Sequence, residues 1–217
     1  MKKKPVFHYA FVIFATLFLD TSLAHAQATS CDGKKMVVLG DSLVAGYGLP
    51  PGQAYPERLA TKLGDLGYKL EIINAGVSGD TSSGGLARLD WSLGNDTDLV
   101  LIELGANDAL RGIPAEKTRE NLDEMIKRLK ARSIPVLLVG MLAPPNMGET
   151  YGEAFNSIYP DLAAKHETGF YPFFLDGVAA EQALNQDDGF HPNIDGISVI
   201  LDRSLPTVER FLKSNCP

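Results

Sequence analysis

The stretch Met36-Val37-Val38-Leu39-Gly40-Asp41-Ser42 decides the fold that we expect for this chain of 217 residues. An uninterrupted apolar run that ends at a glycine is typical of a strand buried on both faces of a parallel sheet. The polar residues Asp41 and Ser42 would then follow the carboxyl end of that strand, where sheets of this kind bind their ligands.

Strands and helices alternate along the rest of the chain. We expect further strands over residues 70–73, 99–104, 135–139 and 173–175, and helices over residues 56–66, 115–132, 151–166 and 197–212. Pro160 interrupts the third of these helices, and Pro206 is expected to kink the last. The alternation predicts an α/β fold, a three-layer α/β/α sandwich around a mostly parallel five-stranded sheet.

Composition and charge narrow the class of protein. The chain is 45% hydrophobic and 22% charged, which is the usage of a globular domain. Its formal net charge is −7, whereas a nucleic-acid-binding protein carries a basic face. We therefore expect no nucleic-acid partner, and a monomer is taken as the default.

The first 26 residues have the pattern of a secretory signal peptide. Three lysines follow Met1, residues 6–19 are mostly apolar, and Ala24-His25-Ala26 fits a cleavage site. The alternative is an uncleaved anchor, but the apolar run is short for a bilayer. We expect a signal peptide over residues 1–26, a single domain over residues 27–217, a periplasmic or extracellular location, and no stable membrane insertion after cleavage.

The residues left after cleavage limit the chemistry. They carry a net charge of −9 and only two histidines, His166 and His191. His166 is expected on a solvated helix face, so His191 is the better candidate for a base. Cys31 and Cys216 lie at the two ends of the mature chain, and an oxidising compartment favours a disulfide between them. Two free thiols are the alternative.

Small and polar residues follow the other predicted strands as well. Residues 74–80 follow the second strand, residues 105–108 follow the third, and residues 188–193 precede the last helix. Because parallel strands end at the same edge of a sheet, we expect these segments to lie together around Ser42.

Ser42, His191 and Asp188 fit the roles of a catalytic triad. A serine hydroxyl needs a base to take its proton, and His191 can serve. Asp188 precedes His191 by three residues, so its carboxylate can reach the imidazole in a turn, fix its tautomer and stabilise its charged form. The alternative role of Ser42 is a helix N-cap.

An acyl-transfer site also needs hydrogen-bond donors for the oxyanion of the tetrahedral intermediate. Three candidates are the backbone N–H of Ser42, the backbone N–H of Gly79 and the side-chain amide of Asn107. The alternative role of Gly79 and Asn107 is that of ordinary turn residues.

These four blocks resemble those of the GDSL or SGNH hydrolases, which are named for Ser, Gly, Asn and His. Ser42, Gly79, Asn107 and His191 match them in order, and residues 103–112 and 187–193 are typical of the bacterial secreted arylesterase, thioesterase I and lysophospholipase branch. The resemblance implies a flavodoxin-like sandwich that needs no metal and no cofactor. A metal site at Asp41, Asp108, Asp188 and His191 is the poorer reading, because it has one histidine and no ligand pair at helical spacing. Asp41 is expected to support its turn, and Asp108 to hold the adjacent loop.

The expected activity is therefore hydrolysis of a carboxylic ester or thioester by a serine esterase. Because coenzyme A is cytosolic, lysophospholipids and aryl or alkyl esters are better candidate substrates than acyl-CoA. Residues 109–114 and 141–151 are expected to border the acyl group, and the alternative for them is ordinary surface loop. The candidate substrate-binding residues are Asp41, Ala109, Leu110, Met141, Leu142, Pro144 and Met147.

Two other functions stay open. The same site could deacetylate a carbohydrate, which favours exposed aromatic residues beside it; Tyr47 and Trp91 are candidates, although Trp91 could be in the core. A non-catalytic periplasmic binding protein would be expected to have lost one of the four blocks, and all four are present.

Overall fold

Five parallel strands form one sheet in the computed structural model, which describes residues 1–3 and 31–216. The strands are β1 (Lys35–Gly40), β2 (Glu71–Gly76), β3 (Leu99–Glu103), β4 (Val136–Val139) and β5 (Gly169–Tyr171). Their order across the sheet is β2-β1-β3-β4-β5, and every neighbouring pair is parallel. The prediction of a parallel five-stranded sheet is confirmed.

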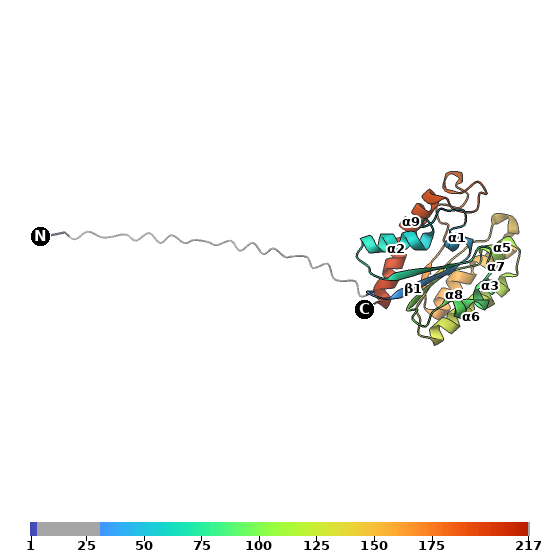
Figure 1. Cartoon of the computed structure of the whole chain (residues 1–217), viewed down its shortest axis with the longest axis horizontal. Helices are drawn as coiled ribbons and strands as arrows, with labels where there is room; N and C mark the ends of the chain where they lie inside the picture. The colour runs from blue at the N-terminus through green and yellow to red at the C-terminus, as the bar shows by residue number, and fades with distance from the viewer. Residues whose placement is uncertain (4–30, 217) are drawn as a thin grey trace.

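Helices cover both faces of this sheet, which gives the predicted three layers (Figure 1). The longer helices are α2 (Tyr55–Asp65), α6 (Ala115–Ala131), α7 (Glu149–Asn156), α8 (Ile158–His166) and α9 (Ile194–Asn215). The shorter ones are α1 (Ser42–Ala45), α3 (Ser82–Ala87), α4 (Leu89–Ser92) and α5 (Ala106–Leu110), with 3-10 turns at Pro145–Met147 and Gln182–Leu184. Helices α2 and α9 pack together on one face, and α3, α6 and α8 lie on the other (Figure 1).

The burial of each strand follows its place in the sheet. Every residue of β3 and β4 is buried, because helices cover these strands on both faces. The edge strand β2 has no fully buried residue. Helix α6 presents Leu122, Met125, Ile126 and Leu129 to the core at helical spacing, so the periodicity that predicted this helix is the one that buries it.

The expected fifth strand was placed wrongly. Residues 173–175 form no strand, and β5 lies at Gly169–Tyr171 instead. Pro172 follows β5 directly and has no N–H to donate to a sheet, so the ladder ends there. Phe174 is buried in the core without being part of the sheet, which is why its apolar neighbourhood resembled a strand.

The helix expected over residues 151–166 is two helices. Helix α7 ends at Asn156 and α8 begins at Ile158, with Ser157 between them. Pro160 lies in the first turn of α8, where backbone N–H groups have no partner within the helix. The proline is therefore compatible with the start of a helix, whereas it would have broken the middle of one. Helix α9 continues through Pro206.

The order of the strands along the chain reverses its direction between β1 and β3. Parallel sheets bind their ligands in the crevice beyond the strand ends at such a reversal. Helix α1 begins here, directly after β1, and passes close to the end of β2. A Cβ atom on Gly76 would lie 2.2 Å from the backbone nitrogen of Ala45. The glycine that ends β2 therefore lets α1 lie over the sheet edge.

The predicted signal peptide falls almost entirely on residues 4–30, which lie outside the described residues. Within the described part of the chain, no helix is long and apolar enough to cross a membrane.

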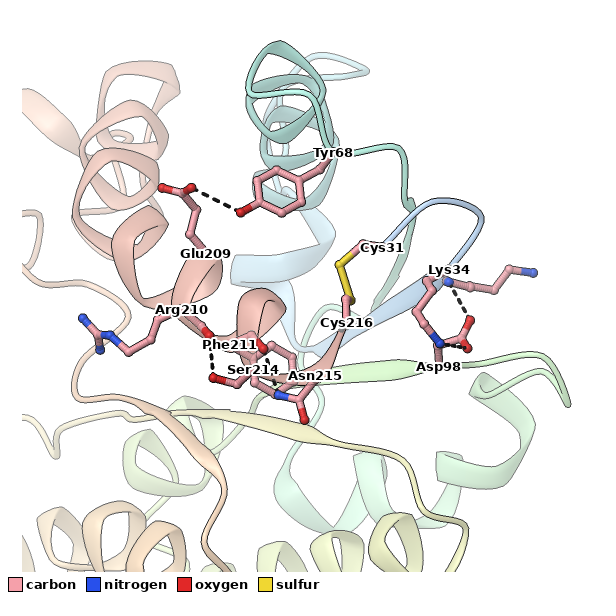
Figure 2. Close-up of a disulfide and its surroundings, with 11 residues drawn as sticks. Cys31, Lys34, Tyr68, Asp98, Glu209, Arg210, Phe211, Ser214, Asn215 and Cys216 are labelled. Carbon is pink, nitrogen blue, oxygen red and sulfur yellow. Dashed lines mark hydrogen bonds and ion pairs between the residues drawn. A yellow bond between two sulfur atoms is a disulfide. The ribbon is translucent and has the colours of Figure 1, made fainter. Parts of the chain in front are cut away.

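Cys31 and Cys216 form a disulfide, as the sequence predicted (Figure 2). Both residues are nearly inaccessible to solvent, and their Cα atoms are 5.0 Å apart. The bond joins the segment before β1 to the end of α9 across a sequence separation of 185 residues. Cross-linking so long a segment removes much of the conformational freedom of the unfolded chain.

Replacing both cysteines by serine should lower the free energy of unfolding by about 2–5 kcal/mol and the Tm by roughly 5–15 °C. Thermal unfolding of the variant and of the oxidised wild type measures this. Because the disulfide lies at the amino ends of the strands, esterase activity at a temperature well below both Tm values should be preserved. An unchanged Tm would contradict the predicted role of this bond.

Candidate active site

Ser42 is the first residue of α1, and its side chain is almost fully buried (8% exposed). Asp41 caps the helix: its Oδ1 atom accepts a hydrogen bond of 3.0 Å from the backbone N–H of Leu43. The cap is thus Asp41 and not Ser42, which removes the structural role that was the alternative for the serine. The Ser42 hydroxyl is left to make other contacts.

That hydroxyl lies 2.9 Å from Nε2 of His191, and Nδ1 of the same ring lies 2.6 Å from Oδ2 of Asp188. The second carboxylate oxygen of Asp188 accepts the backbone N–H groups of Phe190 and His191. The structure therefore brings together the three residues that the sequence proposed. The contact to Asp188 holds the His191 ring with Nε2 directed at the serine.

The hydrogen bonds to Asp188 stabilise its charged form. The backbone N–H of His191, followed by the His191 side chain, lowers the pKa of Asp188 to about 2 despite some desolvation. Asp188 is therefore an anion at every pH where an esterase works, and it can stabilise a positive charge on His191.

Two further candidates flank the serine. Gly79 has a φ of +83°, a conformation that favours glycine, and its backbone N–H has no hydrogen-bond partner among residues 1–3 and 31–216. The side-chain amide of Asn107, at the start of α5, donates a 3.0 Å hydrogen bond to Oδ2 of Asp41. An amide has two N–H bonds, so one remains for a ligand.

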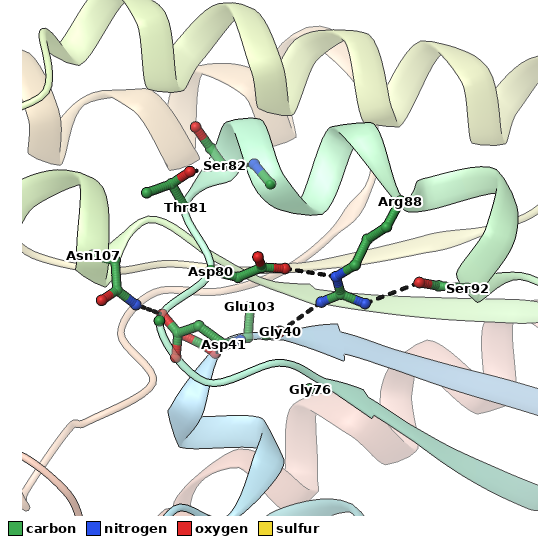
Figure 3. Close-up of polar contacts among 12 residues, drawn as sticks. Gly40, Asp41, Gly76, Asp80, Thr81, Ser82, Arg88, Ser92, Glu103 and Asn107 are labelled. Carbon is green, nitrogen blue, oxygen red and sulfur yellow. Dashed lines mark hydrogen bonds and ion pairs between the residues drawn. The ribbon is translucent and has the colours of Figure 1, made fainter.

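Arg88, for which the sequence analysis has no expectation, connects the segments that carry these groups. Its Nε donates to Asp80 at 2.6 Å, and its Nη2 donates to the carbonyl of Gly40 at 2.9 Å (Figure 3). A third hydrogen bond goes from Nη1 to Ser92. Arg88 thus ties the end of β1 to the residue that follows Gly79. No motif or spacing in the sequence pointed to this role.

Asp108 holds the loop of Asn107, as expected. Its buried carboxylate accepts hydrogen bonds from the backbone N–H and hydroxyl of Ser82 and from the hydroxyl of Thr118. Asn121 in turn donates to the Ser82 hydroxyl. This network fixes α5 against α3 and α6 and leaves Asn107 at a defined position.

A further carboxyl group, that of Glu103, lies beside Asp41 and is completely buried. Its Oε2 is 3.5 Å from the backbone nitrogen of Asp41, and its Oε1 has no hydrogen-bond partner in the described part of the chain. Burial raises the pKa of Glu103 well above its ordinary value, and the nearby Asp41 carboxylate raises it further. Burial likewise raises the pKa of Asp41 to about 6. Burial and the neighbouring carboxylate therefore both favour the neutral, protonated form of Glu103.

The candidate substrate-binding residues separate into two groups. Asp41, Ala109 and Met141 are buried, which leaves their side chains little surface for contact with a substrate. Ala109 and Met141 belong to the hydrophobic core, and the Asp41 carboxylate is used by α1 and Asn107. Leu110 and Leu142 are exposed, and Pro144 and Met147 are half-buried, so these four remain candidates.

Three other expectations concern single side chains. His166 is buried and contacts Asp123, so a solvated position for it was wrong. Trp91 is 86% exposed and is not in the core. Tyr47 is also exposed, and its ring centroid lies 4.7 Å from that of His191. Among residues 1–3 and 31–216, no three His, Cys, Asp or Glu side chains are grouped as metal ligands.

A hydroxyl, an imidazole and a carboxylate in series, at the switch point of an α/β/α sandwich, define a serine hydrolase. Comparison with known sequences gives the family. The chain belongs to the GDSL-like lipase/acylhydrolase family, whose profile matches residues 38–197.

Named relatives agree with this assignment. Esterase TesA of Pseudomonas aeruginosa is 42% identical over 197 residues, which are 90% of this chain and 94% of that protein. The thioesterase 1/protease 1/lysophospholipase L1 of Escherichia coli K12 is 39% identical over 186 residues, 85% of this chain and 87% of that protein. The crystal structure of AlinE4, an SGNH-hydrolase family esterase, has a TM-score of 0.70 at 42% identity and covers 82% of this chain and 96% of its own.

Replacing Glu103 by glutamine tests whether the folded protein holds this buried side chain in its neutral form. Between the ordinary pKa of glutamate and the raised pKa of Glu103, the folded wild type keeps a proton that the unfolded chain releases, so its stability falls as pH rises. Glutamine does not titrate, so the variant lacks this contribution to the pH dependence of stability. The stability of Glu103→Gln relative to wild type should therefore increase with pH, by up to about 1.4 kcal/mol per pH unit.

Urea unfolding of both proteins between about pH 5.5 and 7.5 measures the difference. Glu153→Gln, which changes an exposed glutamate on α7, is the matched control and should show no such trend. A constant difference for Glu103→Gln across this range would show that Glu103 is not held neutral.

Proposed function

We propose that this chain hydrolyses carboxylic esters through an acyl-enzyme on Ser42. The observation that carries the proposal is the continuous hydrogen-bond series from Ser42 through His191 to Asp188, with distances of 2.9 and 2.6 Å. The esterases, thioesterase and lysophospholipase among its relatives support the same class of reaction.

In the first half of the reaction, the Ser42 hydroxyl attacks the carbonyl carbon and Nε2 of His191 takes its proton. Asp188 stabilises the imidazolium that results. The tetrahedral intermediate then collapses, the bond to the leaving alcohol or thiol breaks, and His191 gives its proton to the leaving group. In the second half, water attacks the acyl-serine with His191 again as base, and the acid leaves.

The negative charge of each intermediate needs donors that are already in place. The backbone N–H of Gly79 has no partner among the described residues, and one N–H of the Asn107 amide remains after its bond to Asp41. The backbone N–H of Ser42 lies at the start of α1, where the helix does not use it. These three groups are our proposed oxyanion hole.

Of the parts of an ester substrate, the acyl chain is the one that best fits the apolar surface formed by Leu110 and Leu142. Leu110 and Leu142, which follow the ends of β3 and β4, are both exposed. The two loops that carry them are joined by a hydrogen bond of 2.8 Å from the Tyr151 hydroxyl to the carbonyl of Ile113. We assign medium to long acyl esters, including lysophospholipids, to this surface, and expect thioester cleavage in vitro.

Export across the inner membrane is part of this proposal. The pattern of residues 1–26 is that of a signal peptide, and the Cys31–Cys216 disulfide is of the kind that persists in oxidising compartments. A periplasmic or extracellular enzyme rarely meets coenzyme A esters, so oxygen esters are its proposed physiological substrates.

A short-chain carbohydrate esterase is the second candidate. The observation in its favour is Tyr47, an exposed aromatic ring beside His191, on which a sugar could stack. Hydrolysis confined to acetyl esters would select this alternative over the acyl hydrolase.

Ser42→Ala should lower kcat/KM for p-nitrophenyl esters by about four to six powers of ten, because it removes the nucleophile. Ser83→Ala, which changes an exposed serine on α3, is the matched control and should match wild type. A fluorophosphonate probe should label wild type and Ser83→Ala but not Ser42→Ala. Full esterase activity in Ser42→Ala would refute the mechanism.

The acyl surface predicts a dependence on chain length. For p-nitrophenyl esters from acetyl to hexadecanoyl, kcat/KM should rise toward octanoyl or longer, because each buried methylene contributes about 0.8 kcal/mol. Replacing Leu110 and Leu142 together by glutamine should lower kcat/KM for the octanoyl ester about tenfold and leave the acetyl ester within about twofold.

Leu66→Gln is the control for this series, because Leu66 is similarly exposed but follows α2 at the other edge of the sheet. A dodecanoyl ester that reacts far more slowly than an acetyl ester would contradict the proposed acyl surface.

A further inference from the structure

The contact between Ser42 and His191 joins two segments that are far apart in the chain. Ser42 belongs to the segment of residues 42–48, and His191 belongs to the loop of residues 186–192, so 149 residues separate the two side chains. Their distance is therefore fixed only by how these two segments are held together.

Gln186 makes hydrogen bonds to both segments. Its Nε2 donates to the carbonyl of Tyr47 at 2.7 Å and to the carbonyl of Pro192 at 3.0 Å. Its backbone N–H donates to the carbonyl of His191 at 2.8 Å. One side-chain amide thus spans the segment of the nucleophile and the loop of the base, and the backbone N–H of Gln186 adds a bond to the carbonyl of His191 itself.

Tyr47, which accepts the bond from Gln186, is itself bonded to the backbone of the nucleophile. The backbone N–H of Tyr47 donates to the carbonyl of Ser42 at 3.1 Å. Within residues 31–216, the Gln186–Tyr47 bond is the only hydrogen bond between the two segments besides the Ser42–His191 contact itself. The Tyr47 ring also packs against the His191 ring, so the connected backbone carries a second contact to the base.

The space around the Gln186 side chain is tight. Gln186 is half-buried, and a Cβ atom on Gly48 would lie 2.1 Å from its Oε1 atom. Gly48 therefore leaves room for the glutamine amide and lets its Nε2 face the Tyr47 carbonyl.

We propose that Gln186 is a positioning residue that sets the distance and angle between the Ser42 hydroxyl and Nε2 of His191. The inference rests on the proposed esterase function, since it assigns Gln186 a role in the same proton transfer. Gln186 acts on the backbone of both segments and contacts no reacting atom. Its loss therefore changes the rate of proton transfer and leaves ester binding as it is.

The first test compares Gln186→Met with wild type. Methionine keeps the approximate length of the side chain and removes both donated bonds. We expect kcat for p-nitrophenyl butyrate to fall about 10- to 100-fold, because a displacement near 1 Å has an effect of this size, and KM to stay within about twofold. The rate at which a fluorophosphonate reacts with Ser42 should fall in parallel, since that reaction also moves the Ser42 proton to His191 as fluoride leaves.

Gln182→Met is the matched control, because it makes the same chemical change at an exposed glutamine four residues earlier, whose side chain has no hydrogen bond to any residue in the described ranges 1–3 and 31–216. It should match wild type in kcat and KM. The Tm of each variant is measured so that activities are compared on folded protein.

A second pair of variants leaves Gln186 in place. Gly48→Ala pushes a methyl group against the Gln186 amide, whereas Gly52→Ala imposes a similar backbone strain with no atom near the new methyl group. The φ angles of the two glycines are +73° and +78°. Gly48→Ala should lower kcat at least fivefold more than Gly52→Ala, with KM again unchanged.

The outcomes separate this inference from the proposed function. Activity that survives Ser42→Ala overturns the proposed function. If activity depends on Ser42 but Gln186→Met keeps kcat within about twofold, or changes KM alone, the positioning role is refuted. If Gln186→Met does not fold, the Gly48 and Gly52 variants decide: equal values of kcat overturn the inference.

Discussion

The parallel pairing of β1 with both β2 and β3 is the constraint on which the site depends. Gly40 pairs with Gly76 on one side and with Glu103 on the other, so three chain segments leave the sheet at the same level. Ser42, Gly79 and Asn107 each lie within four residues of that level. Three parts of the proposed machinery thus come together because of strand register, and only His191 and Asp188 must be brought from elsewhere.

The same register crowds acidic side chains beneath the serine. Asp41 and Glu103 leave neighbouring strands at one level, and both are buried. Two negative charges on neighbouring buried groups are unfavourable, so the protonated form of one carboxyl is favoured. Asp41 has the hydrogen bonds from Leu43 and Asn107 that stabilise an anion, whereas Oε1 of Glu103 has none in the described residues. Burying the carboxyl groups of Asp41 and Glu103 lowers the stability of the fold, but Asp41 thereby holds the Asn107 amide in a fixed position.

Much of this molecule could be predicted from its sequence, and the reasons differ by element. Strands β1, β3 and β4 are continuous apolar runs because both faces of the sheet are covered, and a run of this kind is visible without a structure. Strand β5 has only three residues, Gly169–Tyr171, too few for a pattern, and a buried Phe174 just beyond it gave a false one. Helices α1, α3, α4 and α5 have four to six residues each, which is also too short for helical periodicity.

The catalytic candidates were predictable because their chemistry fixes residue types, whereas two of their supports, Arg88 and Gln186, were not. Arg88 and Gln186 act by bonding backbone groups, the carbonyls of Gly40 and Tyr47. A backbone carbonyl accepts a bond from any suitable side-chain donor. No particular residue type is therefore required at positions 88 and 186, and no spacing in the sequence reveals them. Only the folded arrangement shows which side chain reaches which peptide. It follows that two chains with the same four blocks can differ in how firmly those blocks are held, and therefore in rate, through residues that belong to none of them.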